Sequence, residues 1–257
     1  MESKYQFAQE LIREMGSFLR AHLHDELRIE QKSHFTDLVT HLDRAVQDQM
    51  TAAILRQYPR GLIFGEEDSH RAELKTGSVW VIDPIDGTTN FIVQKADFAI
   101  LLAYFEDGVG QFGLIYDVMA DELYHGGGRF PVYKNDQLLP AYQDKPLGQS
   151  LIGINTGLYS SDIAGLASLC EKTLGTRSFG SAGISMAYVL TGRLTAYASY
   201  IYPWDYAAGT ILGEKLGYSL LPLLDEEIDY DSRQLVLLLP SCKINEVKGI
   251  LRQHDIT

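Results

Sequence analysis

The chain has 257 residues, of which 46% are hydrophobic, and its 34 Asp and Glu against 22 Lys and Arg give a formal net charge of −12. This length is enough to bury a substantial core in one large or two coupled domains. The acidic balance argues against a nucleic-acid backbone as the main partner.

The pattern of hydrophobic residues predicts two helices at the start of the chain. Apolar side chains recur at steps of three and four residues, which is the spacing of one helix face. They are Phe7, Leu11, Ile12, Met15, Leu19 and Leu23 in the first helix, and Leu38, Leu42, Val46, Met50 and Ile54 in the second. Residues 58–61, Tyr-Pro-Arg-Gly, are expected to end the second helix.

From residue 62 onward the pattern favours strands. Short apolar runs between turn residues predict strands at 62–65, 79–82, 98–105, 110–116, 121–124 and 130–133. Asp107-Gly108 predicts a hairpin turn. The three glycines at 126–128 stand between two of these runs, so a turn or bulge is favoured there over a nucleotide-binding loop.

After a turn-rich stretch at 140–148, strands and helices alternate, which is typical of an α/β unit. Strands are predicted at 151–154, 176–179, 194–198 and 235–239, and helices at 163–174, 184–192, 205–217 and 244–253. We therefore expect an N-terminal α+β domain over residues 1–147 and a C-terminal α/β domain over residues 148–257.

One nine-residue segment carries the chemistry. Residues 83–91 read Asp-Pro-Ile-Asp-Gly-Thr-Thr-Asn-Phe and follow the apolar run at 79–82. Two carboxylates this close repel each other unless a cation lies between them. Oxygen ligands without a nearby His or Cys favour Mg²⁺ or Mn²⁺ over zinc. The Gly-Thr-Thr turn can direct backbone N–H groups toward an anion, and a metal facing an anion is what phosphate-ester hydrolysis needs.

Other interpretations of this segment are disfavoured. An EF-hand loop needs Asp or Asn at its third position and Glu at its twelfth, where this chain has Ile85 and Gln94. A Walker A loop needs a Gly-Lys-Ser/Thr ending, which is missing. Phosphatases that form an aspartyl-phosphate have two Asp with one residue between them, whereas two residues lie between Asp83 and Asp86. Attack by metal-activated water is therefore favoured, with an ordinary Asp-Gly turn as the structural alternative.

Residues 83–91 resemble the first signature of the inositol monophosphatase family of Mg²⁺-dependent, lithium-sensitive phosphatases. Three more segments match in the expected order over residues 5–240: Asp37-Leu38-Val39-Thr40 with Asp43, Gly65-Glu66-Glu67, and the second signature at 204–209, Trp-Asp-Tyr-Ala-Ala-Gly. The resemblance implies a layered α-β-α-β-α sandwich of the sugar-phosphatase type, with the active site between the two halves. Family members are commonly homodimers, so a homodimer is expected here.

The resemblance also implies roles for individual residues. Glu66, Asp83 and the Ile85 carbonyl would hold one Mg²⁺, and Asp83, Asp86 and Asp205 would hold a second. Glu66 and Asp43 would support a weaker third ion. Mn²⁺ could substitute for Mg²⁺. Thr88, hydrogen-bonded to Asp43, would orient the attacking water, so Glu66, Thr88 and Asp43 are the candidate catalytic residues. The N–H groups of Gly87 and Thr88 would take the phosphate. Asp86, Ser181, Ala182 and Asp205 are the candidate substrate contacts.

Several of these residues have simpler interpretations. Glu66 could be a solvated strand end, Asp43 a surface charge, and Asp205 a helix N-cap, a role compatible with metal binding. Lys32 is a candidate lid residue over the metal site, although an ordinary surface lysine is favoured. Ser181 in its glycine-flanked turn could simply cap a helix.

Substrate choice is the open point. Seven residues before the second-signature Asp, inositol-specific members carry a Glu that contacts sugar hydroxyls, and this chain has Ala198. Strict selection of inositol 1-phosphate is therefore in doubt. Nearby Tyr197, Tyr200 and Tyr202 could stack on a base or sugar, although a core or dimer contact is the commoner role of such a cluster.

The expected function is Mg²⁺-dependent hydrolysis of a small polyol or sugar phosphate, with no nucleic-acid or membrane partner. The alternatives within the class are phosphatases of NADP(H), 3′-phosphoadenosine 5′-phosphate or fructose 1,6-bisphosphate. A regulatory binding protein that retains the fold is the alternative of another class. Only Cys170 and Cys242 occur, the N-terminus lacks a signal-like stretch, and no run of about 18 apolar residues exists, so a cytoplasmic protein is expected.

Overall fold

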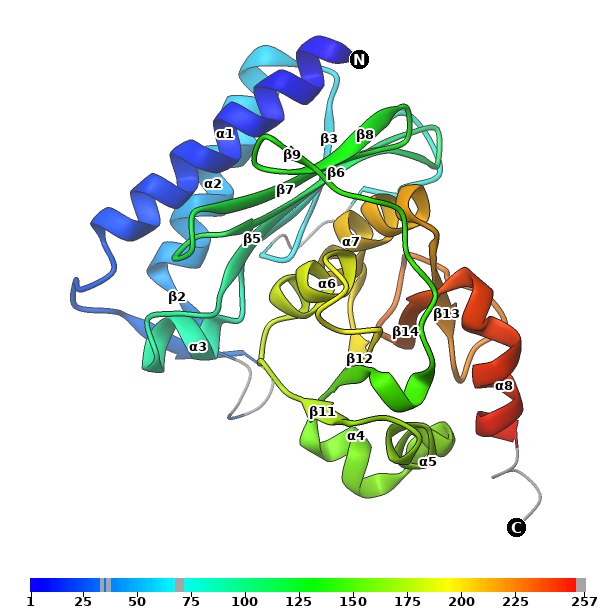
Figure 1. Ribbon diagram of the computed structural model, residues 1–257. Coiled ribbons are helices and arrows are strands. Elements are labelled where there is room, and N and C mark those ends of the chain that lie inside the picture. Colours follow the sequence, from blue (N-terminus) through cyan, green and yellow to red (C-terminus); the bar gives the residue numbers. More distant parts are fainter. Residues whose placement is uncertain (33–34, 36–37, 68–71, 253–257) are drawn as a thin grey trace.

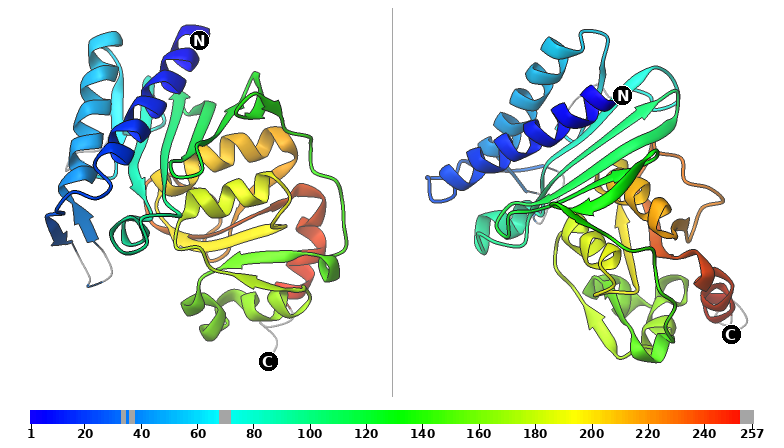
Figure 2. Two further views of the ribbon diagram at one scale, coloured as in Figure 1. Left: turned by 60° about the vertical axis from the view of Figure 1, so that its left-hand side comes forward. Right: turned by 45° about the horizontal axis from the view of Figure 1, so that its top comes forward.

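The computed structural model describes residues 1–32, 35, 38–67 and 72–252, and these form five alternating layers of helices and sheets (Figures 1 and 2). Asp37 of the first matching segment lies outside the described residues. The layered architecture is the one expected from the sequence.

The first outer layer consists of α1 (Glu2–Ala21) and α2 (His41–Gln57), which cover one face of a seven-stranded sheet (Figure 2). The strand order of this sheet is β3-β4-β5-β6-β7-β8-β9. The strands are β3 (Leu62–Gly65), β4 (Ser78–Asp86), β5 (Ala99–Glu106), β6 (Val109–Asp117), β7 (Glu122–Gly127), β8 (Phe130–Lys134) and β9 (Gln137–Leu138).

Alternating apolar side chains explain why this sheet is covered on both faces. In β4, Trp80 and Ile82 pack with α1 and α2, whereas Val79 and Val81 pack with the helices on the other side. A strand buried on both faces reads as a continuous apolar run, which is why 79–82 shows no polar alternation.

The middle layer is formed by α6 (Ala182–Leu190) and α7 (Pro203–Leu216), which lie between the two sheets (Figure 1). Both helices are buried almost all round. They share one hydrophobic cluster with side chains from both sheets, including Leu101 and Phe105 from the larger and Val236 and Leu238 from the smaller. The two halves of the chain therefore share a core.

The smaller sheet has the order β11-β10-β12-β14-β13. Its strands are β10 (Leu151–Ile154), β11 (Gly175–Arg177), β12 (Ala196–Ile201), β13 (Tyr218–Pro222) and β14 (Gln234–Pro240). On its far face Leu235, Leu237 and Leu239 form a separate cluster with α5 (Leu166–Glu171) and α8 (Ile244–Arg252), which make the last layer.

Some elements differ from the expectation. Leu38 belongs to β2 (Leu38–Thr40), which pairs with β1 (Ile29–Gln31) before α2 begins. The helix expected at 163–174 is broken, because Asp162, Ala164 and Gly165 have positive φ, and only α5 remains α-helical. Two short helices, α3 (Thr88–Val93) and α4 (Thr156–Ser161), and the strand β13 had no periodic signal.

The three glycines at 126–128 form the expected bulge and turn between β7 and β8, where the strand register shifts. A Cβ on Gly126 would lie 2.2 Å from the Pro131 carbonyl oxygen, and φ of that residue is +136°. This close backbone approach, and not a nucleotide, accounts for the glycines.

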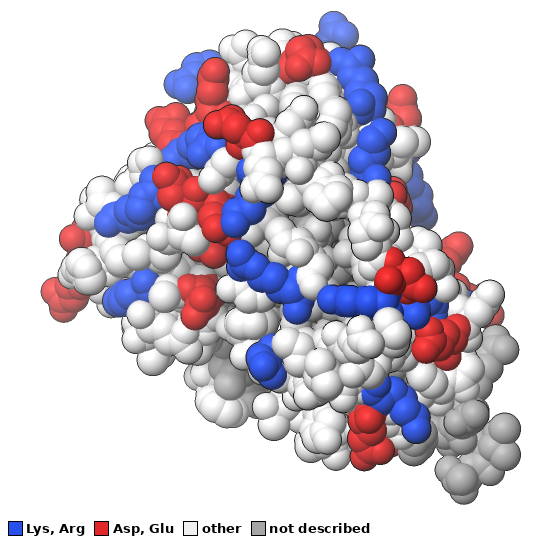
Figure 3. All heavy atoms as spheres, viewed as in Figure 1, with Lys and Arg blue, Asp and Glu red and all other residues white. Residues whose placement is uncertain are grey.

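Among the described residues, no helix is both long and apolar enough to cross a bilayer. On the face drawn in Figure 3, a short row of Lys and Arg crosses the middle, with Asp and Glu on both sides of it.

Candidate active site

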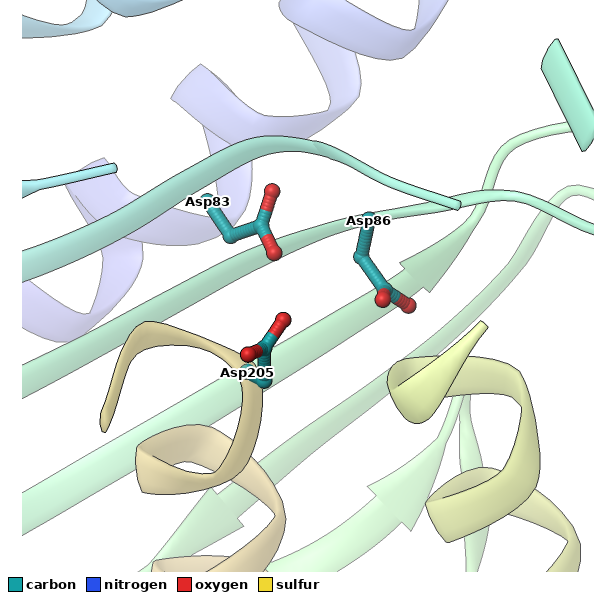
Figure 4. A group of neighbouring side chains, drawn as sticks. All are labelled: Asp83, Asp86 and Asp205. Carbon is teal, nitrogen blue, oxygen red and sulfur yellow. The ribbon is translucent and has the colours of Figure 1, made fainter. Parts of the chain in front are cut away.

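Three aspartates from distant parts of the chain meet between the sheets (Figure 4). Asp83 and Asp86 extend from the end of β4, and Asp205 points toward them from the first turn of α7. One carboxylate oxygen of each lies within 4.8 Å of the others. Oxygens at this spacing can share a divalent cation.

An irregularity in β4 allows Asp83 and Asp86 to point the same way. Residues three apart in a regular strand point to opposite faces. Here the pairing with β5 shifts between Asp83 and Asp86, across Pro84 and Ile85. Proline has no N–H to donate, so a break in the ladder at this position is physically reasonable.

Asp83 is almost completely buried, and neither of its carboxylate oxygens has a hydrogen-bond partner within the described structure. Burial raises its pKa well above the usual range, and the charges of Glu66, Asp86 and Asp205 raise it further. A buried carboxylate without a donor is costly. A cation would remove this cost, so the residues present fit a metal site.

Asp86 is also buried, and burial raises its pKa, but donors on the loop before α6 and on α6 itself oppose that shift. The Ser181 hydroxyl donates to Asp86, the Ala182 N–H donates at 2.9 Å, and the Gly183 N–H donates at 2.7 Å. Ser181 also caps α6 by accepting from the Ile184 N–H. Of the candidate substrate contacts, the Ser181 hydroxyl and the Ala182 N–H are thus engaged with Asp86.

Asp205 is the third residue of α7, and its carboxylate accepts the Tyr202 N–H at 2.7 Å. The alternative interpretation of Asp205 as the N-cap is therefore wrong, because Tyr202 occupies that position. Burial and the charges of Asp86 and Glu66 raise the pKa of Asp205. Asp205 as a whole residue is partly exposed, whereas Asp83 and Asp86 are buried.

Glu66 lies beside the cluster because its N–H continues the β3–β4 pairing by donating to the Ile82 carbonyl at 3.1 Å. Lys32 Nζ lies 2.8 Å from Glu66 and also contacts Glu67. Burial raises the pKa of Glu66, and the Lys32 charge opposes this shift. The predicted lid lysine thus forms ion pairs with a predicted metal ligand and its neighbour.

Asp43 faces the site from α2 and is fully buried, so it is not a surface charge. It accepts hydrogen bonds from the Thr40 N–H at 2.8 Å and from the Thr88 hydroxyl at 3.0 Å. Burial raises its pKa to about 6. The Thr88 Oγ1 also lies 3.0 Å from the Ile85 carbonyl oxygen, so its single proton has two competing acceptors.

The turn after Asp86 is fixed by Gly87 and Asn90. Gly87 has φ +89°, and a Cβ there would lie 3.0 Å from the Ser181 Cβ. The Asn90 side chain donates to the carbonyls of Asp97 and Phe179, at 2.8 and 2.6 Å. Asn90 thereby ties the signature turn to the loop before α6, a role that the sequence analysis did not assign to it.

A cavity of about 450 Å³ opens beside these residues. Asp86, Gly87 and Asp205 line one part of it, and Tyr197, Tyr200 and Tyr202 line another. Its remaining lining is Ile154, Asn155, Ser178, Phe179, Gly180, Ser181, Ala182, Ser185, Ser199, Ile201 and Arg233. A space of this size can take a small phosphorylated metabolite.

Comparison with known proteins identifies the group to which this arrangement belongs. The family model described as the inositol monophosphatase family matches residues 1–247. The chain is 37% identical over 238 residues to inositol-1-monophosphatase of Bacillus subtilis, with 90% of each chain covered. It is 30% identical over 232 residues to the fructose-1,6-bisphosphatase/inositol-1-monophosphatase of Thermotoga maritima, with 90% of this chain and 89% of the relative covered. The chain belongs to the inositol monophosphatase family.

A solved structure agrees. The crystal structure of inositol monophosphatase-II from Staphylococcus aureus superposes with a TM-score of 0.88 at 34% identity, covering 99% of this chain and 97% of the other. Inositol monophosphatase family members are metal-dependent phosphoric monoester hydrolases that act on small phosphorylated metabolites. This chain is accordingly a phosphoric monoester hydrolase whose acidic cluster can bind metal.

The interpretation of Ala198 as the missing sugar-contacting position needs correction for this family member. Its side chain packs with Leu237 and Leu239 in the cluster on the far face of the smaller sheet, not in the cavity. A Glu there would be buried among apolar side chains. Tyr197 and Ser199 of β12 line the cavity instead, because side chains alternate along a strand and these two lie on the face opposite to Ala198.

Proposed function

We propose that this protein hydrolyses phosphate monoesters of small polyols or sugars with Mg²⁺, with Mn²⁺ as a substitute. The observation that carries the proposal is Asp83, which is buried with two unpartnered oxygens among carboxylates from β4 and α7. Glu66, Asp83 and the Ile85 carbonyl would hold one ion, and Asp83, Asp86 and Asp205 a second. Asp43 and Glu66 would support a third. When bound, the cations supply the charge that activates water and balances the phosphate.

The chain's own residues would do the rest. Thr88 would orient the attacking water through its hydroxyl, whose proton goes to Asp43 or Ile85 and leaves lone pairs for a water proton. The backbone N–H groups of Gly87 and Thr88, at the start of α3, would hold the phosphate. Ser181, Ala182 and Gly183 keep Asp86 in place through their hydrogen bonds. The leaving alcohol would occupy the cavity.

The substrate proposal stays broad. Apart from Asp86 and Asp205, no lining residue in the described structure carries a carboxylate that could select sugar hydroxyls. Phosphatases of NADP(H), 3′-phosphoadenosine 5′-phosphate and fructose 1,6-bisphosphate are the alternatives. We also propose a cytoplasmic homodimer, inhibited by Li⁺ at the more weakly held metal position, with Lys32 as a residue that leaves Glu66 when metal binds.

Phosphate release from a panel of sugar and nucleotide monophosphates tests the function. We expect turnover with Mg²⁺, loss of turnover with chelator, and partial inhibition by millimolar Li⁺. Asp83→Asn should lower kcat by at least about 100-fold, as expected when charge stabilisation of the transition state is lost.

The control is folding. Mg²⁺ should raise the midpoint of thermal unfolding of the wild-type protein and leave that of Asp83→Asn nearly unchanged, because only the former binds the ion tightly. An Asp83→Asn variant with wild-type turnover would refute the proposed site.

A further inference from the structure

Arg233 lines the cavity together with Asp86 and Asp205, and no pattern in the sequence indicated a role for it. It is the only cationic residue among those that line this cavity in the described part of the chain. A cation here acts on whatever enters the cavity.

The guanidinium of Arg233 is held in one place. Its Cζ lies 4.6 Å from the ring centroid of Tyr200 and 5.5 Å from that of Tyr202. Its Nε donates to the Tyr200 carbonyl at 3.0 Å. Tyr202 in turn stacks on Trp204, with centroids 4.5 Å apart and planes 10° apart. Stacking on two rings and one backbone hydrogen bond orders a side chain that is otherwise very mobile.

Most N–H donors of Arg233 have no protein acceptor among the described residues. A guanidinium has five N–H groups, and the one hydrogen bond of Arg233 within the described structure uses only Nε. No carboxylate of the described residues forms an ion pair with it, although Asp and Glu outnumber Lys and Arg in this chain. The forked Nη groups match the geometry of a carboxylate or a phosphate.

We propose that Arg233 is a specificity-determining residue, which binds a second anionic group, phosphate or carboxylate, on the alcohol part of the substrate. The ester phosphate lies at the aspartates and the Gly87 turn, and the second anion lies at the Tyr200–Tyr202 end of the same cavity. This inference rests on the proposed function and narrows its substrate class to phosphate esters with two anionic groups.

Three esters on one sugar ring test the inference: glucose 1-phosphate, glucose 1,6-bisphosphate and glucuronic acid 1-phosphate. The first has no second anion, and the other two distinguish phosphate from carboxylate. Arg233→Gln should lower the ratio of kcat/KM for the preferred ester with a second anionic group to that for glucose 1-phosphate by roughly 10-fold, the lower end for hydrogen bonds to charged groups. The lower kcat/KM should result mainly from a higher KM for the ester with the second anionic group.

Two further variants separate the charge from its packing. Arg233→Lys keeps the charge but loses the planar stack, so it should recover part of the ratio. Arg193→Gln is the matched control, because Arg193 also lies over a tyrosine ring but lines a different cavity. Its Cζ is 4.8 Å from the centroid of the Tyr188 ring. This variant should leave the ratio unchanged. Raising the ionic strength should reduce the ratio in the wild type and not in Arg233→Gln, since an exposed charge is screened.

A measurement without turnover completes the test. In a Thr88→Ala background, calorimetry should show weaker binding of the intact ester with a second anionic group when Arg233→Gln is added, and little change for glucose 1-phosphate. If the wild type hydrolyses all three esters and Arg233→Gln leaves their ratio unaltered, the inference about Arg233 is wrong. If the wild type hydrolyses none of them and no ester of the wider panel, the proposed function fails instead.

Discussion

Asp43 shows how strongly the site depends on burial of single carboxyl groups. It is enclosed by α2, Thr40 and Thr88, and burial raises its pKa from the usual 3.8 to about 6. The hydrogen bonds from Thr40 and Thr88 oppose this shift without cancelling it. The folded protein therefore binds a proton at Asp43 more tightly than the unfolded chain does.

This shift predicts a pH dependence of the metal-free protein. A carboxyl with a raised folded-state pKa stabilises the fold below its unfolded pKa, and this contribution is lost as the pH rises through about 6. In the wild-type protein this effect should lower the free energy of unfolding by about 3 kcal/mol between about pH 4 and pH 7. In Asp43→Asn that decrease should be absent. Urea unfolding in chelator measures it. Asp48→Asn, at an exposed position of α2, is the control. Equal pH slopes in wild type and Asp43→Asn would contradict the assignment.

At the scale of elements, the turn between β4 and α3 packs closely against the loop before α6. Gly87 supplies the positive φ, and Asn90 and Ser181 link this turn to α6. The same packing holds Asp86 against the N-terminal end of α6. A change in the turn must therefore move either Asp86 or Ser181.

Two glycine substitutions separate backbone strain from crowding. Gly87 has φ +89° with the Ser181 Cβ at 3.0 Å, whereas Gly217 has φ +90° with no atom within 4 Å of a Cβ. Gly217→Ala should cost about 1 kcal/mol of stability from backbone strain alone. Gly87→Ala should cost about 1–3 kcal/mol and also lower kcat, because Ser181 and Asp86 must shift. Chemical unfolding and phosphate release measure the two effects. If both variants lost the same free energy of unfolding and Gly87→Ala kept full activity, the contact with Ser181 would be unimportant.

At the scale of the whole molecule, the shared middle layer decides whether the halves can be separated. The domain boundary near residue 147 stays a prediction, although each sheet lies on one side of it. The larger sheet buries Val81, Leu101 and Phe105 against α6 and α7, which come from the C-terminal half. Without these helices that face would be exposed to water.

We therefore expect a fragment of residues 1–147 to be unfolded or aggregated when expressed alone. Burial of the apolar face stabilises the sheet by about 25 cal/mol per Å², and the fragment lacks that contribution. Circular dichroism and analytical ultracentrifugation measure the outcome, and co-expression with residues 148–257 is the control that should restore folded protein. A monomeric, cooperatively unfolding fragment would show that the N-terminal half is an independent domain.

The sequence predicted most strands and the longer helices because their apolar periods are local. It also predicted that Asp83, Asp86 and Asp205 lie together, but only through the resemblance, since no local pattern joins residue 83 to residue 205. Asn90, Ser199 and Arg233 were missed because their roles depend on contacts between distant segments. Ala198 was misread because counting residues back from Asp205 does not show which face of β12 a side chain occupies.

The outermost layer has a practical consequence. Helices α5 and α8 are separated from the aspartates by the smaller sheet, and the exposed Cys242 lies just before α8, while Cys170 is buried. A thiol-reactive dye should therefore label Cys242 selectively, on the side of the molecule that the substrate does not visit. Immobilisation through Cys242 should therefore leave the cavity open to ligand.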